Sequence, residues 1–307
     1  PADVGRQLLR LRPRQQHAEV ERVQKAPLRD PAPLLHQLAV HDGDLPGRAA
    51  KADATQLQPE AQRLAEALHR GAIDQYTRDP AALDPPLDAV VLCTPVRLVP
   101  VSLRSVLPAL APHALVTDVG STKAGIVRQC EAIAGNAVWF IGSHPIAGSH
   151  KTGVQAARAN LFHNKICIVT PTPRSHPPAL EAVTGLWRFL GMKVICMDPE
   201  AHDAFLAVSS HLPHIAAAAL CHTAKAKGSR IETLLGTGFR DTTRVAEGDP
   251  TLWLDICLEN REPLLEALRG YRQVLDNFLS QLERGDEEAL LHFLTDAQEW
   301  KKRARPR

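Results

Sequence analysis

The chain has 307 residues and a mass of 33.5 kDa, with 36 basic and 34 acidic side chains and a formal charge of +2. This length predicts two domains; 44% apolar residues suffice for a sizeable core, which excludes wholesale disorder. The balanced charge argues against a nucleic-acid binder, and the longest apolar runs, such as 215–221, are too short to cross a bilayer. Six separated cysteines are typical of a reducing compartment. We therefore expect a cytoplasmic protein with no membrane or nucleic-acid partner.

Residues 1–58 differ in composition from the rest of the chain. They contain no Ile, Phe, Tyr, Trp, Met, Cys, Ser or Asn, and five prolines interrupt any long helix. No run in this segment resembles a buried parallel strand. Two interpretations stay open: a mobile, loosely helical extension, or a mistranslated or replaced version of another sequence.

Strands and helices alternate after residue 58. Pro59 begins a predicted helix that ends at Gly71, a natural C-terminal cap. The predicted strands are 88–93, 114–117, 137–141, 165–169 and 193–196, and the predicted helices between them are 101–110, a helix ending near 134, and 179–190. This alternation predicts an α/β domain with a mostly parallel sheet covered on both faces.

The chain is predicted to be helical from residue 200 to 303. Leucines and aromatic residues recur there at steps of three and four residues, which forms one apolar stripe. The stripe consists of Leu264, Leu268, Tyr271, Leu275, Phe278 and Leu282. The fold class is therefore an α/β domain followed by an all-α domain.

Two polar segments follow predicted strands, where open α/β sheets bind their ligands. The first segment holds Thr94 and Pro95, and the second runs from Asp118 through Ser121 to Lys123. Ser121 is placed where a helix N-cap is expected, so its hydroxyl either faces the cleft or serves only as the cap.

A third segment, Gly142-Ser-His-Pro-Ile-Ala-Gly148, follows the strand predicted at 137–141. Its glycines allow close approach of other backbone, and Pro145 holds His144 extended. His144 is either a solvated loop residue or a general base, since an imidazole titrates near neutral pH.

The helical half contributes His211, His214 and Arg244. The two histidines are three residues apart and share one helix face, which Pro213 would kink. Capping or core packing explains them as well as function does, and no carboxylate or Cys at ligand spacing supports a metal site. Arg244 either forks onto a carboxylate or lies on the surface.

Taken together, these motifs closely resemble the prephenate/arogenate dehydrogenase family of tyrosine biosynthesis. The resemblance runs from about residue 59 to 302 in the family's order. The matching motifs are Asp118-Val-Gly-Ser-Thr-Lys123, Gly142-Ser-His-Pro-Ile-Ala-Gly148, Leu161-Phe162, Pro199-Glu-Ala-His-Asp203, Ser210-His-Leu-Pro-His214, Gly238-Phe-Arg-Asp-Thr-Thr-Arg244, Asp249-Pro250, Trp253 and Glu259-Asn260.

The resemblance implies a Rossmann-like domain and an oxidative decarboxylation that uses NAD or NADP. It implies that His144 is the catalytic base and that Ser121 orients it beside the nicotinamide. Thr94, Pro95 and Asp118 would join Ser121 at the cofactor. The substrate, prephenate or arogenate, would be held by His214 and Arg244, with His211 and His150 nearby. The helical domain would form a homodimer.

The sequence departs from the family pattern at two places, and both affect which of the family's properties can be expected here. Residues 20–57 lack the G-x-G-x-x-G that would cradle the cofactor's pyrophosphate. We therefore hypothesise that residues 1–58 come from a shifted reading frame, which translation of the upstream DNA in the other frames tests. In addition, His150 replaces a Glu found in many relatives, so the choice between prephenate and arogenate stays open.

We expect three segments: the atypical residues 1–58, a dinucleotide-binding domain over 59–198, and a helical substrate and dimerisation domain over 199–307. Two other functions stay open. One is a catalytically silent dimer that cannot hold the dinucleotide, and the other is a different Rossmann-plus-helical dehydrogenase that acts on a hydroxy acid.

Overall fold

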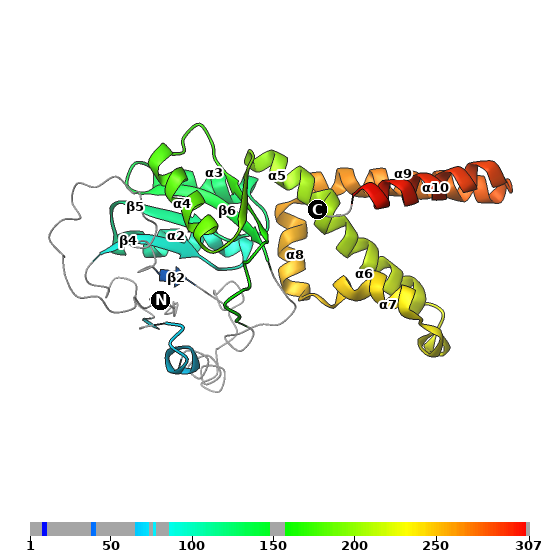
Figure 1. The fold of residues 1–307 in the computed structure, drawn as a ribbon, viewed down its shortest axis with the longest axis horizontal. Coiled ribbons are helices and arrows are strands. Elements are labelled where there is room, and N and C mark those ends of the chain that lie inside the picture. Colours follow the sequence, from blue (N-terminus) through cyan, green and yellow to red (C-terminus); the bar gives the residue numbers. More distant parts are fainter. Residues whose placement is uncertain are drawn as a thin grey trace.

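The computed structural model describes residues 8–10, 38–40, 65–73, 76–77, 86–147 and 157–304. Figure 1 shows two parts: a sheet flanked by helices, and a helical region that extends away from it in two arms. The extension predicted over 1–58 lies outside the described residues except for 8–10 and 38–40. His150 also lies outside them.

The sheet has eight strands in the order β3-β1-β2-β4-β5-β6-β7-β8. The pairs β2–β4, β4–β5, β5–β6 and β7–β8 are parallel, and β6–β7 is antiparallel. The mostly parallel sheet is thus confirmed. The strands are β1 Leu8–Arg10, β2 Leu38–Val40, β3 Tyr76–Thr77, β4 Leu87–Leu92, β5 Leu110–Asp118, β6 Trp139–Ile146, β7 Ile166–Thr170 and β8 Lys193–Cys196.

The expectation that residues 1–58 contribute no parallel strand was wrong. β2 pairs in parallel with β4, with Leu38 opposite Val90 and Val40 opposite Leu92. β1 adds to β2 in the antiparallel sense. Three-residue strands are too short to show an apolar periodicity, so composition could not reveal them.

Helices cover both faces of the sheet, as predicted. On one face α2 (Val99–Val106) and α3 (Ala124–Ala134) pack on a cluster that includes Leu92 and Val116. On the other face α4 (Pro177–Phe189) packs on a cluster that includes Ile141 and Val169. The strands are apolar on both sides for this reason.

Some element boundaries differ from the prediction. The helix expected at 101–110 begins earlier, as the 3-10 turn η3 (Val96–Leu98) followed by α2, and it ends in a second 3-10 turn, η4 (Leu107–Ala109). Pro108 explains this end, because its ring has no N–H for the helical ladder. β6 is longer than expected: it continues through Ser143 and His144, which pair with Val169 and Ile168 of β7. His144 is therefore a strand residue, and the predicted loop was wrong.

The second region is helical, as predicted. Its helices are α5 Pro199–Leu206, α6 Leu212–Lys225, α7 Thr237–Thr243, α8 Pro250–Glu259, α9 Arg261–Glu283 and α10 Glu287–Arg303, with short 3-10 turns at η7 Ser229–Leu234 and η8 Arg244–Glu247. α9 and α10 form one arm of the region, and α6 and α7 form the other. α5 and α8 lie where the two regions meet (Figure 1).

α5 and α6 form one continuous helix, Pro199–Lys225, which is joined through a π-helical turn, η6 (Ala207–His211). This distortion lies just before Pro213, where a kink was predicted. By length and hydropathy the whole helix could cross a membrane. Its first half carries Asp203, whose carboxylate accepts a hydrogen bond from Ala124 N at the start of α3, so this half packs against the sheet region.

Candidate active site

The loop after β5 is built around a buried ion pair. Lys123 and Asp118 are both fully buried, and the Lys123 ammonium contacts Asp118 Oδ2. Gly120 N donates to the same oxygen at 2.8 Å, and Lys123 Nζ also donates to the Ser143 carbonyl at 2.9 Å. Both charges are therefore satisfied inside the protein, and they fix the shape of the loop.

β6 is tied to this loop immediately before His144. Ser143 N donates to Asp118 Oδ1 at 3.1 Å, and Ser143 Oγ donates to the Asp118 carbonyl at 2.5 Å. Thr117 Oγ1 lies 2.9 Å from Ser143 Oγ. These bonds hold the backbone of β6 rigidly, so the side chain of the next residue has a defined direction.

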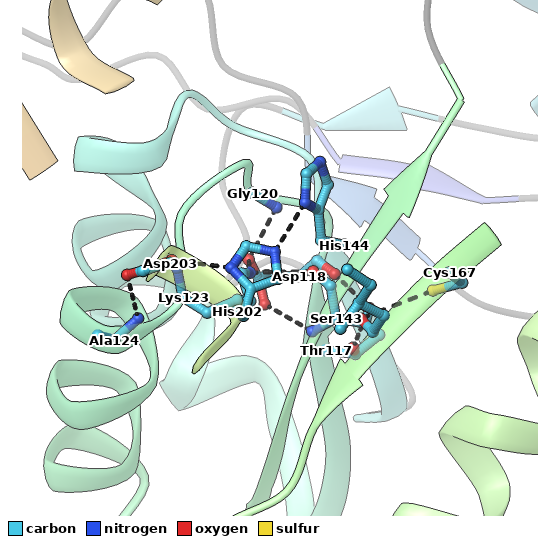
Figure 2. Close-up of polar contacts among 11 residues, drawn as sticks. Thr117, Asp118, Gly120, Lys123, Ala124, Ser143, His144, Cys167, His202 and Asp203 are labelled. Carbon is cyan, nitrogen blue, oxygen red and sulfur yellow. Dashed lines mark hydrogen bonds and ion pairs between the residues drawn. The ribbon is translucent and has the colours of Figure 1, made fainter. Parts of the chain in front are cut away.

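His144 meets a histidine of the helical region. Its Nδ1 lies 2.9 Å from His202 Nε2, and His202 Nδ1 lies 2.8 Å from Asp203 Oδ1. Figure 2 shows the two rings side by side between β6 and the start of α3. His202 and Asp203 are both buried. The contact therefore joins the two regions of the molecule at the predicted base.

Asp203 also caps α3 from the other region. Its two carboxylate oxygens accept hydrogen bonds from Lys123 N at 2.7 Å and Ala124 N at 2.9 Å. Negative charge at a helix N-terminus is favourable. The prediction that Ser121 is the N-cap was wrong: the N-cap is Lys123, and the capping oxygens belong to Asp203. No hydrogen bond joins Ser121 to His144 among the described residues.

His211 and His214 both contact Trp253 of α8. The ring of His214 stacks on Trp253 with centroids 3.5 Å apart, and His211 meets it edge-on at 6.1 Å. The predicted shared face of the two histidines is thus confirmed. His211 Nδ1 lies 2.9 Å from Asn260 Nδ2, which also donates to the Asp203 carbonyl at 2.8 Å. Asn260 therefore links this pair to the Asp203 end of the site.

The remaining predicted site residues are placed as follows. Arg244 is exposed and begins η8, the turn that packs on α6, which carries His214. Thr94 is buried and accepts a bond of 3.3 Å from Ser102 Oγ, and Pro95 precedes η3. Asp118 is fully buried and both of its oxygens are occupied, so it shapes the loop and offers no free oxygen to a ligand.

The histidines of the site are held neutral. Burial lowers the pKa of His144 well below its ordinary value, and the neighbouring His202, Lys123 and His211 lower it further. Burial likewise lowers the pKa of His202, and that of His211 to about 4. Burial also lowers the pKa of His214. His144 is thus available as a proton acceptor at neutral pH.

Comparison with known proteins gives the family. The model for "Prephenate dehydrogenase, nucleotide-binding domain" matches residues 48–196, and the model for "Prephenate dehydrogenase, dimerization domain" matches residues 198–296. The chain belongs to the prephenate dehydrogenase family. A curated relative is the prephenate dehydrogenase of Bacillus subtilis, which is 34% identical over 216 residues. That match covers 69% of this chain but only 58% of the relative's length.

Two solved structures of the prephenate dehydrogenase family are similar to the whole two-part fold. Prephenate dehydrogenase from A. aeolicus, in complex with hydroxyphenyl propionate and NAD+, is 35% identical with a TM-score of 0.75. It covers 80% of this chain, which in turn covers 86% of it. Synechocystis arogenate dehydrogenase is 32% identical with a TM-score of 0.69, and the coverages are 80% and 88%. Both likenesses extend across the sheet and the helical region.

The described edge of the sheet fits part of a dinucleotide site. A Cβ on Gly120 would lie 2.6 Å from Ile126 Cδ1 and 2.8 Å from Asp118 Oδ2, so a side chain at this position would displace the buried Asp118 carboxylate. The hydroxyl of Thr122 is buried there and has no partner among the described residues. The sequence contains no G-x-G-x-x-G that would hold the pyrophosphate.

Reasoning from the sequence missed four residues of this site: Lys123, His202, Asp203 and Asn260. All four lie in motifs that were matched to the family, but they received no role. His202 and Asp203 lie near the start of α5, which begins at Pro199 after the N-cap Asp198. Asp203 lies 80 and 79 positions from its partners Lys123 and Ala124, and His202 lies 58 positions from His144. No local pattern reveals contacts over such separations.

Proposed function

We propose that the chain catalyses the NAD(P)-dependent oxidative decarboxylation of prephenate or arogenate, in the cytoplasm. The observation that carries this proposal is the placement of His144, a neutral imidazole on a rigid strand where the matched nucleotide-binding and dimerisation domains meet. The family match and the bound molecules named for the A. aeolicus relative support it. The domain division proposed is 59–198 and 199–307.

In the proposed reaction His144 accepts the proton of the substrate's 4-hydroxyl group. When bound, the nicotinamide supplies the acceptor for the hydride that leaves C4. The ring carboxylate departs as CO2, and its bonding electrons complete the aromatic ring. The proton held by His144 then returns to the ring oxygen, which gives the phenol and regenerates the base. The protein therefore needs one base, oriented toward the hydroxyl, and groups that fix the substrate. Thr94, Pro95 and Ser121 are the residues proposed to border the cofactor, with Asp118 shaping their loop.

Arg244 is proposed to hold a substrate carboxylate. His214, which stacks on Trp253, and His211 are kept neutral by burial, so they donate hydrogen bonds without supplying a charge. An arginine stays charged at every pH of interest and can donate two parallel hydrogen bonds to a carboxylate. His150 is proposed to lie near the substrate's side chain.

The dimerisation domain leads us to propose a homodimer formed through the helical region. Apolar side chains along α9 are exposed in the single chain, among them Leu275 at 48% and Leu279 at 53%. Leu275 belongs to the predicted apolar stripe, and Leu279 lies one turn further along the same helix. A second copy of the chain would cover these side chains.

The test is a side-by-side assay with prephenate, arogenate and simple 3-hydroxy acids, each with NAD+ and NADP+. Turnover of prephenate or arogenate with release of CO2 is expected. Turnover of a 3-hydroxy acid alone would favour the other dehydrogenase class.

The silent dimer remains the second candidate, because the pyrophosphate motif is missing from the sequence. Titrating NAD+ and NADP+ while following the fluorescence of the four tryptophans separates the two cases. Saturable binding supports the enzyme, and no binding of either supports the silent protein. The nucleotide-binding match begins at residue 48, so it includes 48–58 of the segment 1–58 that was proposed not to be native family sequence. Residues 1–47 lie outside the match.

A further inference from the structure

A line of three side chains connects the proposed base to the start of α3. Asp203 lies at one end, His202 in the middle and His144 at the other end, with nitrogen–oxygen and nitrogen–nitrogen distances of 2.8 and 2.9 Å (Figure 2). His202 is completely buried, so no solvent competes for its ring nitrogens. In such a line, the group that accepts at one end determines which ring nitrogen of each histidine carries the proton.

The direction of each hydrogen bond follows from Asp203. Both of its oxygens face backbone N–H groups, those of Lys123 and Ala124, which can only donate. The carboxylate therefore accepts, and His202 must carry its proton on Nδ1 to donate to Oδ1. A neutral imidazole has one proton, so His202 Nε2 holds a lone pair. That lone pair accepts from His144 Nδ1.

The remaining nitrogen of His144 is then defined. With the proton on Nδ1, His144 Nε2 has a free lone pair, and this is the atom that can accept a proton from a hydroxyl group. In the opposite tautomer Nε2 would carry the proton and could only donate. The same carboxylate–imidazole logic sets the tautomer of metal-binding and triad histidines.

We propose that Asp203 and His202 are positioning residues that fix His144 in its Nδ1–H tautomer, so that Nε2 is the base. This inference rests on the proposed function for its catalytic meaning, but the tautomer itself is a property of the free protein. In this proposal, two residues of the helical region, His202 and Asp203, set the tautomer of His144, which lies in the sheet region.

A purely structural role for Asp203 makes a different prediction. In that case it only caps α3, and its loss would lower stability without moving the proton on His144. Asp198 offers a matched control on the same helix: it is the N-cap of α5, bonds Ala201 N at 2.8 Å and is exposed. Asp198→Ala removes an equal charge from the same helix, and the Asp198 side chain makes no hydrogen bond to Asp203, His202 or His144 among the described residues.

The experiment records ¹⁵N NMR spectra of the full-length protein labelled at histidine, without ligands, for wild type, Asp203→Ala and Asp198→Ala. His144→Asn assigns the signals by their disappearance. Wild type and Asp198→Ala should show His144 protonated on Nδ1. Asp203→Ala removes the acceptor of the His202 Nδ1 proton, so His202 is no longer held in one tautomer and a fraction of His144 should become protonated on Nε2.

Turnover gives the second readout. Asp203→Ala should lower kcat about 10-fold or more with little change in KM, because only His144 protonated on Nδ1 can act as the base. If wild-type His144 carries its proton on Nε2, or if Asp203→Ala leaves it held wholly as Nδ1–H, the proposal is wrong. If Asp203→Ala does not fold, His202→Ala replaces it, and a His144 still held wholly as Nδ1–H would overturn the proposal. Correct tautomers in a wild-type protein without turnover would instead contradict the proposed function alone.

Discussion

The two regions of the molecule bury their apolar residues very differently. The sheet region packs two large clusters on its two faces, with residues such as Leu92, Leu103 and Val169 fully buried. In the helical region only Leu206, Ala207, Ala217, Ile256 and Leu264 are buried apolar residues among those described. The sheet region therefore completes its own core, whereas the helical region does not.

The exposed apolar side chains are also distributed unequally between the sheet region and the helical region. Of the 21 large apolar residues exposed in the described part of the chain, five belong to the sheet region: Val101, Ile146, Ile166, Phe189 and Ile195. The other sixteen lie on the helices from Phe205 to Trp300. Exposed apolar surface of this extent is typical of an interface. The sheet region thus completes its own core within the chain, whereas the helical region leaves apolar side chains exposed, which supports the homodimer proposed above.

The largest expected effect is on the chemistry that the sheet region carries. His144→Asn removes the proposed base while keeping a polar side chain on β6, so kcat should fall between about 100- and 10,000-fold with KM nearly unchanged. Steady-state kinetics measure both constants. His163→Asn, an exposed histidine of the same region, is the control. Turnover near the wild-type rate in His144→Asn would remove this residue from the mechanism.

The next effect concerns the stability of the sheet region itself. Lys123→Met leaves the fully buried Asp118 carboxylate without its partner, which should lower the free energy of unfolding by about 3–5 kcal/mol. Urea unfolding followed by circular dichroism measures it. Lys193→Met, at an exposed position on β8, should change stability little. A loss below about 1 kcal/mol for Lys123→Met would contradict the central role of the ion pair.

A substitution on the helical arm tests whether a second copy completes this region. Leu275→Glu places a charge in the proposed interface once per subunit, so the dimer should dissociate at concentrations at least about 30-fold higher, since burying a leucine is worth about 2 kcal/mol. Analytical ultracentrifugation measures this shift. Ile195→Glu is the matched control, because Ile195 is similarly exposed, at 43%, but lies on the sheet region. Equal behaviour of the two variants would break the contrast between the regions.

A smaller effect is expected from the cation that the helical region offers to the substrate. Arg244→Ala should raise KM about 10-fold or more and leave kcat less affected, because a carboxylate loses a charge-assisted hydrogen bond. Arg240→Ala, one turn earlier and also exposed, is the control. An unchanged KM would place Arg244 on the surface without a role in binding.

The smallest expected effect is on the pH dependence of kcat/KM. Burial, together with His202, Lys123 and His211, lowers the pKa of His144 well below its ordinary value of about 6.5. Since the neutral imidazole is the active base, kcat/KM should stay level as the pH falls through 6.5 and drop only at more acidic pH. A profile with its acid limb at or above pH 6.5 would show that the base is not held in this buried setting.

The sequence predicted the architecture well because the main elements are long and periodic. The strands at 87–92 and 166–170 and the apolar stripe of α9 carry their own local signals. The predicted ends of elements were wrong where pairing with a distant segment sets them. β6 continues through His144 because it pairs with β7. Asp203 was missed for the same reason, since its partners Lys123 and Ala124 lie in the other region.

The π-helical turn at Ala207–His211 has a consequence for how the site is assembled. A π turn holds one more residue than an α turn, so it rotates the residues before it by about 100° relative to those after it. Upstream, His202 and Asp203 face the sheet region; downstream, His214 faces Trp253. Deleting Val208 would restore an even helical winding and turn one of these faces away from its target. The helix thus aims two groups of side chains in two directions by means of a single inserted residue.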